Sequence, residues 1–294
     1  MIRVSALLRT GYHVISGRKE LKYRLGFRRD PDLRRVFILG NGPSLMEDYL
    51  RFRDALRAGD SIGVNRFAVS ELFTELKPKL YVLCDPVFCS REEEVESPTL
   101  LEMRRQLFAT IRSRLDWDMT LLVPGYGYRE IALQLSHSRL RILPFNSAKL
   151  DHRLPGWIKY PLLRKNYACF SLNNVMVASI YLSINLGYRQ IILLGADHSW
   201  SEQMRVDDQN RVIMEDPHFY DGSQKTPQVL LSGTQGHHGQ YGAAAFFQDL
   251  VNTFTIYQEL ERYAKKMGAQ VWNASARSYI DAFDRIREIP PIQP

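Results

Sequence analysis

The stretch that decides the fold is Val36-Phe37-Ile38-Leu39-Gly40-Asn41-Gly42-Pro43-Ser44-Leu45. Its four consecutive apolar residues end at a turn signal, which predicts a short buried strand. The two glycines permit close backbone approach, and Pro43 and Ser44 suit the start of a helix. Because the free N–H groups and the dipole of a helix N-terminus favour an anion, the turn predicts a phosphate-binding site. It is not a Walker loop, since no Gly-Lys-Ser/Thr follows, and it lacks the third glycine of the dinucleotide fingerprint.

Outward from this stretch, short apolar strands alternate with helical patterns. Further strands are predicted at 61–65, 80–84, 119–124, 140–143, 190–195 and 270–273, and helices at 47–58, 98–114, 174–186 and 244–267. This alternation predicts an α/β fold, a Rossmann-like and mostly parallel sheet with helices on both faces. Residues 146–170 are predicted to be irregular. The polar segment at about 198–240 is too long for an ordinary connection, which predicts a lid-like insertion.

The basic charge of the chain is concentrated at its N-terminus. The formal net charge is +7, and residues 1–35 account for all of it, with ten basic and three acidic side chains. A nucleic-acid enzyme would more often carry such an excess along the groove of its body, so no nucleic-acid partner is predicted. Apolar residues recur at near-helical spacing within residues 1–30, which predicts a basic amphipathic extension. Such a segment can lie on an anionic membrane surface or pack on the protein or on a second subunit, and both interpretations stay open.

Composition narrows the class of protein further. Apolar residues make up 45% and charged residues 24%, as in ordinary globular domains. No apolar run approaches the roughly 18 residues of a membrane span, and no signal-peptide pattern is present. Three cysteines are too few for a disulfide framework and indicate a reducing compartment. We therefore expect a cytoplasmic domain at 36–285, preceded by the extension at 1–35 and followed by a tail at 286–294, with peripheral contact at the inner membrane leaflet as an open alternative.

Polar residues follow five of the predicted strands. They are Asn41 and Ser44, Asn65, Asp85, Asp197 and His198, and Asn273 and Ser275. In a doubly wound sheet, ligands bind beyond the carboxyl ends of the strands. Each residue alone has a structural alternative, because Asn, Asp and Ser also cap helices and make turns. Their joint position at one edge of the sheet predicts a ligand site.

The predicted insertion contains four of the seven histidines, among them His237 and His238. No His-x-x-x-His or Glu-x-x-His pair supports a metal site there, so none is predicted. General acid–base chemistry fits better, because histidine titrates near neutral pH and can accept a proton from a hydroxyl group. For His237 and His238 the structural alternative is a solvated, glycine-rich loop.

These residues resemble a known family. The first strand with Gly-Asn-Gly-Pro-Ser-Leu resembles the opening motif of the bacterial sialyltransferases that use CMP-activated sialic acid. Later features are similar in order, namely Asn65-Arg66-Phe67, the stretch from Ser171 to Tyr188, Gly195-Ala196-Asp197 and Asn273-Ala274-Ser275. Gly-Pro-Ser-Leu with Gly-x-Asp also resembles the wider domain of 6-hydroxymethylpterin diphosphokinases and motility-associated glycosyl-transfer factors. The resemblance covers about residues 36–280, and only its first motif is specific.

The resemblance implies a glycosyltransferase that moves a sialic acid- or Kdo-like sugar acid from a CMP-activated donor to a glycan or lipid-linked acceptor in surface polysaccharide synthesis. It implies no metal and no cofactor, since the nucleotide-sugar donor is itself the substrate. It implies donor binding by residues that follow strands and by two in the turn before the apolar helix: Asn41, Gly42, Ser44, Asn65, Asp85, Ser171, Asn173, Asn273 and Ser275. It implies a histidine base, His237 or His238, with Asp197 and His198 as further catalytic candidates.

Two departures from the family weaken the assignment of the sugar. The family eases phosphate departure with two lid tyrosines, whereas His198, Ser199 and Trp200 follow Asp197 here; Asp85 also replaces an acceptor-side Asn. A sugar acid needs a cation near its carboxylate, for which the sequence offers Lys159, Arg164, Lys165 and Arg205. Two alternatives therefore stay open. One is a pterin-type diphosphokinase that uses ATP and magnesium held by Asp85 and Asp197, and the other a non-catalytic nucleotide-binding assembly protein. The oligomeric state also stays open.

Overall fold

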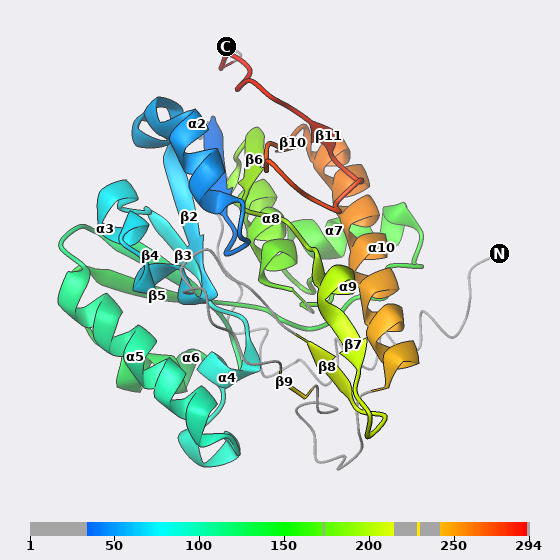
Figure 1. Cartoon of the computed structure of the whole chain (residues 1–294). Helices are drawn as coiled ribbons and strands as arrows, with labels where there is room; N and C mark the ends of the chain where they lie inside the picture. The colour runs from blue at the N-terminus through cyan, green and yellow to red at the C-terminus, as the bar shows by residue number, and fades with distance from the viewer. Residues whose placement is uncertain (1–33, 173, 215–227, 230–241, 293–294) are drawn as a thin grey trace.

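The computed structural model describes residues 34–172, 174–214, 228–229 and 242–292 (Figure 1). Its centre is an eight-stranded sheet in the order β11-β10-β6-β1-β2-β3-β4-β5, with parallel neighbours throughout. The strands are β1 (Arg35–Leu39), β2 (Asp60–Val64), β3 (Leu80–Val82), β4 (Met119–Pro124), β5 (Leu140–Phe145), β6 (Gln190–Leu194), β10 (Gln270–Asn273) and β11 (Asp284–Arg285). The predicted Rossmann-like α/β fold is confirmed.

Strand order reverses beside β1. The chain runs outward from β1 through β2, β3, β4 and β5, and then returns to place β6 on the other side of β1. Leu39 at the end of β1 pairs with Leu194 at the end of β6. The segments that follow these two strands therefore start side by side and then diverge, which makes this the topological switch point of the sheet.

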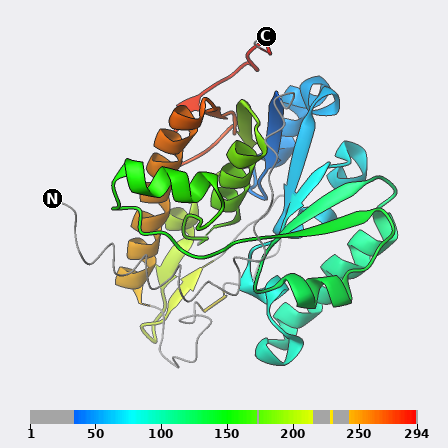
Figure 2. The same cartoon turned by 180° about the vertical axis from the view of Figure 1, so that it is seen from behind.

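Helices cover both faces of the sheet (Figures 1 and 2). Phe37 and Leu39 pack on the face that carries α2 (Leu45–Ala58), α3 (Leu72–Leu76), α4 (Pro86–Cys89), α5 (Pro98–Arg114) and α6 (Tyr128–Gln134). Val36 and Ile38 pack on the opposite face, under α7 (Gly156–Arg164), α8 (Val175–Leu186) and α10 (Ala243–Met267). This alternation follows from the two-residue period of a strand. Two short 3-10 helices, η3 (Asn65–Val69) and η4 (Glu92–Glu94), complete the first layer.

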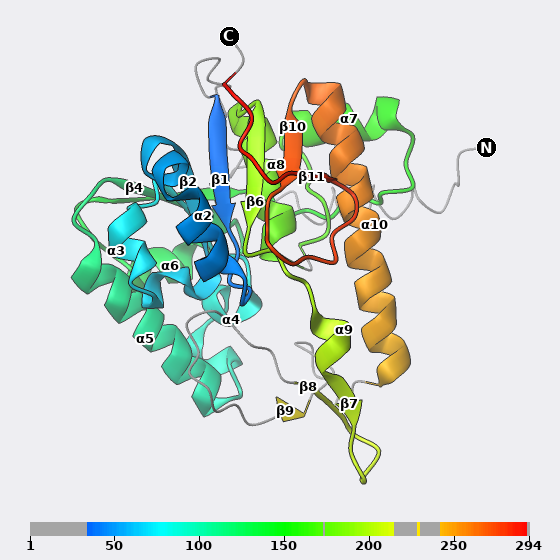
Figure 3. The same cartoon turned by 45° about the horizontal axis from the view of Figure 1, so that its top comes forward.

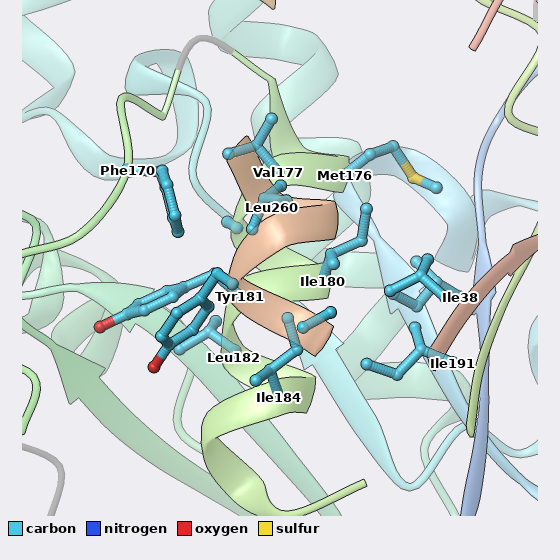
Figure 4. Close-up of a cluster of buried hydrophobic side chains, with 14 of the residues drawn as sticks. Ile38, Phe170, Met176, Val177, Ile180, Tyr181, Leu182, Ile184, Ile191 and Leu260 are labelled. Carbon is cyan, nitrogen blue, oxygen red and sulfur yellow. The ribbon is translucent and has the colours of Figure 1, made fainter. Parts of the chain in front are cut away.

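The helix α8 forms the centre of one hydrophobic layer. Val177, Ile180 and Ile184 are buried in one cluster with the sheet residues Ile38 and Ile191 and with Leu260 of α10 (Figure 4). Each such side chain contributes about 1.5–3 kcal/mol by its removal from water. The Asn174 side chain caps the N-terminus by accepting from the Met176 N–H at 2.7 Å, and Gly187 ends the helix with φ of 114°. The helix is thus fixed at both ends beneath the site.

The prediction of an irregular stretch at 146–170 is wrong for residues 156–164, which form α7. The helix was not predicted because Pro155 stands at its N-cap and Pro161 lies within it, and proline usually ends helical patterns. Lys159, proposed above as a cation for the ligand, points into the interior. Its ammonium group is ion-paired with Glu259 of α10 and donates to the His152 carbonyl at 2.8 Å. It holds α7 on α10.

The described residues of the predicted insertion form a short helix and three short strands. The helix α9 (Trp200–Gln203) leads into β7 (Met204–Val206), and β8 (Val212–Met214) and β9 (Gln228–Val229) complete a three-stranded antiparallel sheet. Figure 3 shows α9, β7 and β8 beyond the end toward which β1 and β6 run. The predicted tail from residue 286 is held at the other end of the sheet, where the Gln190 amide donates to the Pro291 carbonyl at 3.0 Å. Within the described ranges, no helix is long and apolar enough to cross a membrane.

Candidate functional site at the switch point

A pocket of about 210 Å³ lies at the topological switch point. Its walls come from the segments after β1, β2, β3 and β6, from the N-terminus of α8 and from α9. Six of the predicted site residues line it, namely Asn41, Gly42, Asn65, Asp85, Asp197 and His198. The lining also includes Asn174, Trp200 and Gln203, which were not predicted as binding residues.

The two glycine motifs form one structural unit. The Gly40 N–H donates to the Leu194 carbonyl at 2.8 Å, and the Gly42 N–H donates to the Gly195 carbonyl at 2.9 Å. A Cβ on Gly40 would lie 2.4 Å from the Gly195 oxygen, so no side chain fits there. Gly195 itself has φ of +60°, a conformation that favours glycine. The glycines of Gly-Asn-Gly-Pro-Ser and Gly-x-Asp therefore allow the β1 and β6 loops to interlock.

The anion at the N-terminus of α2 is a carboxylate of the protein itself. The Ser44 N–H donates to Asp197 Oδ1 at 3.2 Å, and the Ser44 hydroxyl lies 2.8 Å from Asp197 Oδ2. A carboxylate at this end of a helix satisfies a free N–H group and the helix dipole. Burial raises the pKa of Asp197, and the bonds from Ser44 oppose that shift. The phosphate position predicted from the glycine turn is thus filled by Asp197, and Ser44 lies behind it, outside the pocket lining.

Asp48, in the first turn of α2, joins three loops and was missed by the sequence analysis. Its carboxylate is fully buried and accepts the Gly195 N–H and the Ala276 N–H, both at 2.7 Å. The Ser44 hydroxyl lies 3.3 Å away on the same carboxylate. Burial raises the pKa of Asp48 to about 6, assisted by the nearby Asp197 and opposed by the two backbone bonds. An acidic residue in a first helical turn is common, so the sequence gives no sign of this role.

Asn273 and Ser275 support the Gly195–Asp197 loop from behind instead of lining the pocket. Both side chains are fully buried. The Asn273 amide nitrogen donates to Ser278 Oγ at 2.8 Å, and its oxygen accepts the Ser275 N–H at 3.2 Å. Ser275 Oγ accepts the Ala196 N–H at 3.0 Å. Ser171 is also buried and is not part of the lining.

His198 is a buried, neutral histidine. Its Nε2 lies 2.6 Å from the Tyr257 hydroxyl of α10, and its ring packs 4.3 Å from the ring of Trp200. Burial lowers the pKa of His198 to about 3, so the ring carries no charge at neutral pH. This arrangement fixes the loop after β6 against α10. Asn173, His237 and His238 lie outside the described residues, and their roles stay predictions.

Three amide oxygens at the pocket lack a partner. Asn41 Oδ1, Asn65 Oδ1 and Gln203 Oε1 are buried and accept no hydrogen bond within the part of the chain that the structure describes. The Asn41 orientation is fixed, because its Nδ2 donates to the Val64 carbonyl at 3.1 Å. Buried polar groups are almost always paired, so a cluster of unpaired acceptors calls for an explanation. No pattern in the sequence distinguishes Gln203 from its polar neighbours.

The described lining residues include two acidic side chains and neither lysine nor arginine. Asp85 is exposed and caps α4 by accepting the Val87 N–H at 3.0 Å, while Asp197 is buried at the base of the pocket. Of the other proposed cations, Arg164 and Lys165 are exposed at the end of α7. No group of three or more His, Cys, Asp and Glu side chains in the described ranges is arranged to hold a metal ion.

Comparison with known proteins identifies a relative by structure. No protein-family model matches the sequence, and no curated protein matches it either. The MAf glycosyltransferase from Magnetospirillum magneticum AMB-1 is similar in structure, with a TM-score of 0.50 over 93% of this chain at 14% sequence identity. The matched region is 38% of that protein, so this chain spans well under half of its length. At this level of identity the similarity shows a shared fold.

Proposed function

We propose that this chain is a glycosyltransferase that binds a nucleotide-activated sugar in the pocket between β1 and β6. The observation that carries the proposal is the position of the pocket. It lies at the topological switch point and is lined by the segments after β1, β2, β3 and β6, where doubly wound folds bind nucleotides. The fold shared with the MAf glycosyltransferase supports the class of reaction.

The finer proposal is a CMP-linked sugar acid as donor and a glycan or lipid-linked acceptor. The motif resemblance around Gly40–Leu45 and Gly195–Asp197 supports it. In this reaction the bond between the sugar and the phosphate breaks, the acceptor oxygen bonds to the sugar, and the acceptor proton passes to a base. We assign the base to His237 or His238, and the acceptor side to Asp85, which is exposed at the pocket. His198 is a weaker candidate, because Tyr257 already engages its Nε2.

Thermal-shift measurements with CMP, CDP, UDP, GDP and ATP, each with and without magnesium, test the proposal. A ligand at 100 times its dissociation constant stabilises the folded protein by about 2.7 kcal/mol. We expect stabilisation by CMP or CDP without added metal. A response to UDP or GDP would support the proposed glycosyltransferase activity but would indicate a donor linked to a nucleotide other than CMP. A response to ATP with magnesium alone would indicate the diphosphokinase, and no response to any nucleotide would indicate an assembly protein without this activity.

The base is tested separately, by replacing His237 and His238 one at a time with alanine. We expect both variants to bind CMP as the unmodified protein does, while one of them loses transfer. Full transfer activity in both variants would contradict the assignment.

For residues 1–30 we propose peripheral membrane contact at the inner leaflet. Deletion of this segment should then weaken binding to anionic liposomes, with a dependence on salt; unchanged binding would assign the segment to packing.

A further inference from the structure

The polar chemistry of the pocket is that of an acceptor. Asn41 Oδ1 and Asn65 Oδ1 come from the segments after β1 and β2, and Gln203 Oε1 comes from α9, so three separate elements that line one pocket carry buried oxygens without a partner in the described part of the chain. An unpaired buried oxygen costs about 1–3 kcal/mol, which a ligand that donates hydrogen bonds would recover. Glu261, the other side chain with such an oxygen in the described ranges, lies on α10 outside the lining.

The glycine turn itself is poorly suited to bind an anion. The N–H groups of Gly40, Gly42 and Ser44 are already bonded to the Leu194 carbonyl, the Gly195 carbonyl and the Asp197 carboxylate. The described lining contributes two acidic side chains and no basic one. A phosphate or a carboxylate placed at the Ser44 N–H would meet the Asp197 carboxylate, which already occupies that group.

The α9 side of the pocket adds an aromatic surface. Trp200 and Gln203 lie at the two ends of this short helix, and both line the pocket. The Trp200 ring is supported by the His198 ring, at 4.3 Å between centroids and 39° between planes. Gln203 Nε2 is 3.4 Å from Ser199 Oγ, which leaves the amide oxygen for a ligand. An aromatic surface beside acceptor oxygens suits a ring that has an apolar face and hydroxyl groups at its edge.

We propose that this pocket recognises a hydroxyl-bearing sugar ring through Asn41, Asn65 and Gln203, with Gln203 as a specificity-determining residue. The phosphate of the ligand then lies outside the glycine turn. This inference deepens the proposed function and rests on it, because the ring is taken to belong to a nucleotide-linked sugar. The ring is either the ribose of the nucleotide or the transferred sugar, and both present the same hydroxyl chemistry.

Calorimetric titration of the full chain tests the inference, with CMP, cytidine, 2′,3′-dideoxy-CMP and CMP-N-acetylneuraminic acid as probes. The variant is Gln203→Met, which removes the acceptor at similar size. Gln258→Met, exposed on α10, is the matched control. We expect Gln203→Met to lose about tenfold or more in affinity, because the ligand hydroxyl is left unpaired. Gln258→Met should stay within about threefold of the unmodified protein.

The probes separate the two sources of the ring. If the ribose occupies the pocket, 2′,3′-dideoxy-CMP binds at least tenfold more weakly than CMP, and Gln203→Met adds no further loss for that probe. If the transferred sugar occupies it, CMP-N-acetylneuraminic acid binds more tightly than CMP, and Gln203→Met removes the gain. The inference is overturned if Gln203→Met binds all four probes normally. It is also overturned if loss of the phosphate abolishes binding while loss of the ribose hydroxyls and Gln203→Met have no effect.

Failure of the proposed function gives a different result. If no nucleotide binds the unmodified protein, the proposed function fails, and free D-ribose and N-acetylglucosamine then test the pocket alone. Their titration is followed by NMR through the side-chain amide signals of Asn41, Asn65 and Gln203. Saturable shifts that disappear in Gln203→Met would support recognition of a hydroxyl-bearing ring. Unchanged signals for both sugars would overturn it.

Discussion

Two halves of the same sheet edge use similar polar residues for opposite purposes. In the first, which we call the sealed half, Asp48, Asn273 and Ser275 are fully buried and bonded to neighbouring loops. In the second, the open half, the lining residues Asn41, Asn65 and Gln203 each keep a buried oxygen without a partner in the part of the chain that the structure describes.

The difference separates residues that stabilise the fold from residues that are available to a ligand. Groups whose hydrogen bonds are complete within the protein stabilise the fold and have nothing left to offer a ligand. Polar groups that lack a hydrogen-bond partner lower the stability of the fold. Proteins retain such groups where a ligand supplies the partner. Substitutions in the sealed half should therefore change the free energy of unfolding, whereas those in the open half should change ligand affinity.

The largest effect is expected from Gly40→Ala, at the contact on which both halves depend. Its Cβ would lie 2.4 Å from the backbone oxygen of Gly195, and neither loop can move without breaking the interlock. We expect a loss of about 3 kcal/mol or more in the free energy of unfolding, measured by urea denaturation. Gly242→Ala is the control, because its Cβ would meet nothing within 4 Å. Equal losses in the two variants would contradict the interlock.

Asp48→Asn is expected to change the pH dependence of stability. Folding raises the pKa of Asp48 from its ordinary 3.8 to about 6, so the folded chain binds this proton more tightly. The contribution of Asp48 to the free energy of unfolding therefore falls as pH rises through this window, by about 3 kcal/mol in total. His198 contributes with the opposite sign, because its pKa is lowered to about 3, but it is present in both proteins and cancels.

The measurement is the difference in unfolding free energy between the unmodified protein and Asp48→Asn, at intervals from pH 4 to pH 7. We expect the unmodified protein to lose unfolding free energy relative to Asp48→Asn as pH rises. Asp54→Asn, exposed on the same helix α2, provides the control. A difference that is independent of pH would show that Asp48 does not titrate in this window.

Ser275→Ala should give an intermediate effect confined to stability. The substitution leaves the buried Ala196 N–H without its partner, which costs about 1–3 kcal/mol. Because Ser275 is not part of the pocket lining, nucleotide affinity should change by less than about threefold. Urea denaturation and calorimetry on the same sample measure both. A large loss of affinity with unchanged stability would move Ser275 to the open half.

The smallest effect on stability is expected from Gln203→Met in the open half. Among the described residues its amide makes one hydrogen bond, the 3.4 Å contact with Ser199, and its oxygen has no partner there. We expect the free energy of unfolding to stay within about 0.5 kcal/mol of the unmodified protein or to rise slightly. A loss of about 2 kcal/mol, the size of a broken buried hydrogen bond, would place Gln203 among the residues that stabilise the fold.

The sequence was sufficient for the sheet and for much of its ligand edge. Apolar runs such as Val36–Leu39 and 190–195 mark buried strands, and strand ends locate Asn41, Asn65 and Asp197. The role of each residue at this edge depends on its hydrogen-bond partners in the folded chain. The sequence around a single position does not show those partners. The sequence predicted Asp197 as a site residue, whereas its carboxylate accepts the Ser44 N–H at the N-terminus of α2. Asp48 was expected to be an ordinary acidic residue of a first helical turn, whereas it joins three loops. Gln203 became visible only through its unpaired oxygen.

A crystal structure of the full chain with CMP or a CMP-linked sugar tests the central claim most directly. The account predicts ligand hydroxyls at about 2.7–3.2 Å from Asn41 Oδ1, Asn65 Oδ1 or Gln203 Oε1. It also predicts that the Asp197 carboxylate stays on the Ser44 N–H group. A phosphate bound to the Ser44 N–H with Asp197 displaced, and the three amide oxygens still unpaired, would contradict it.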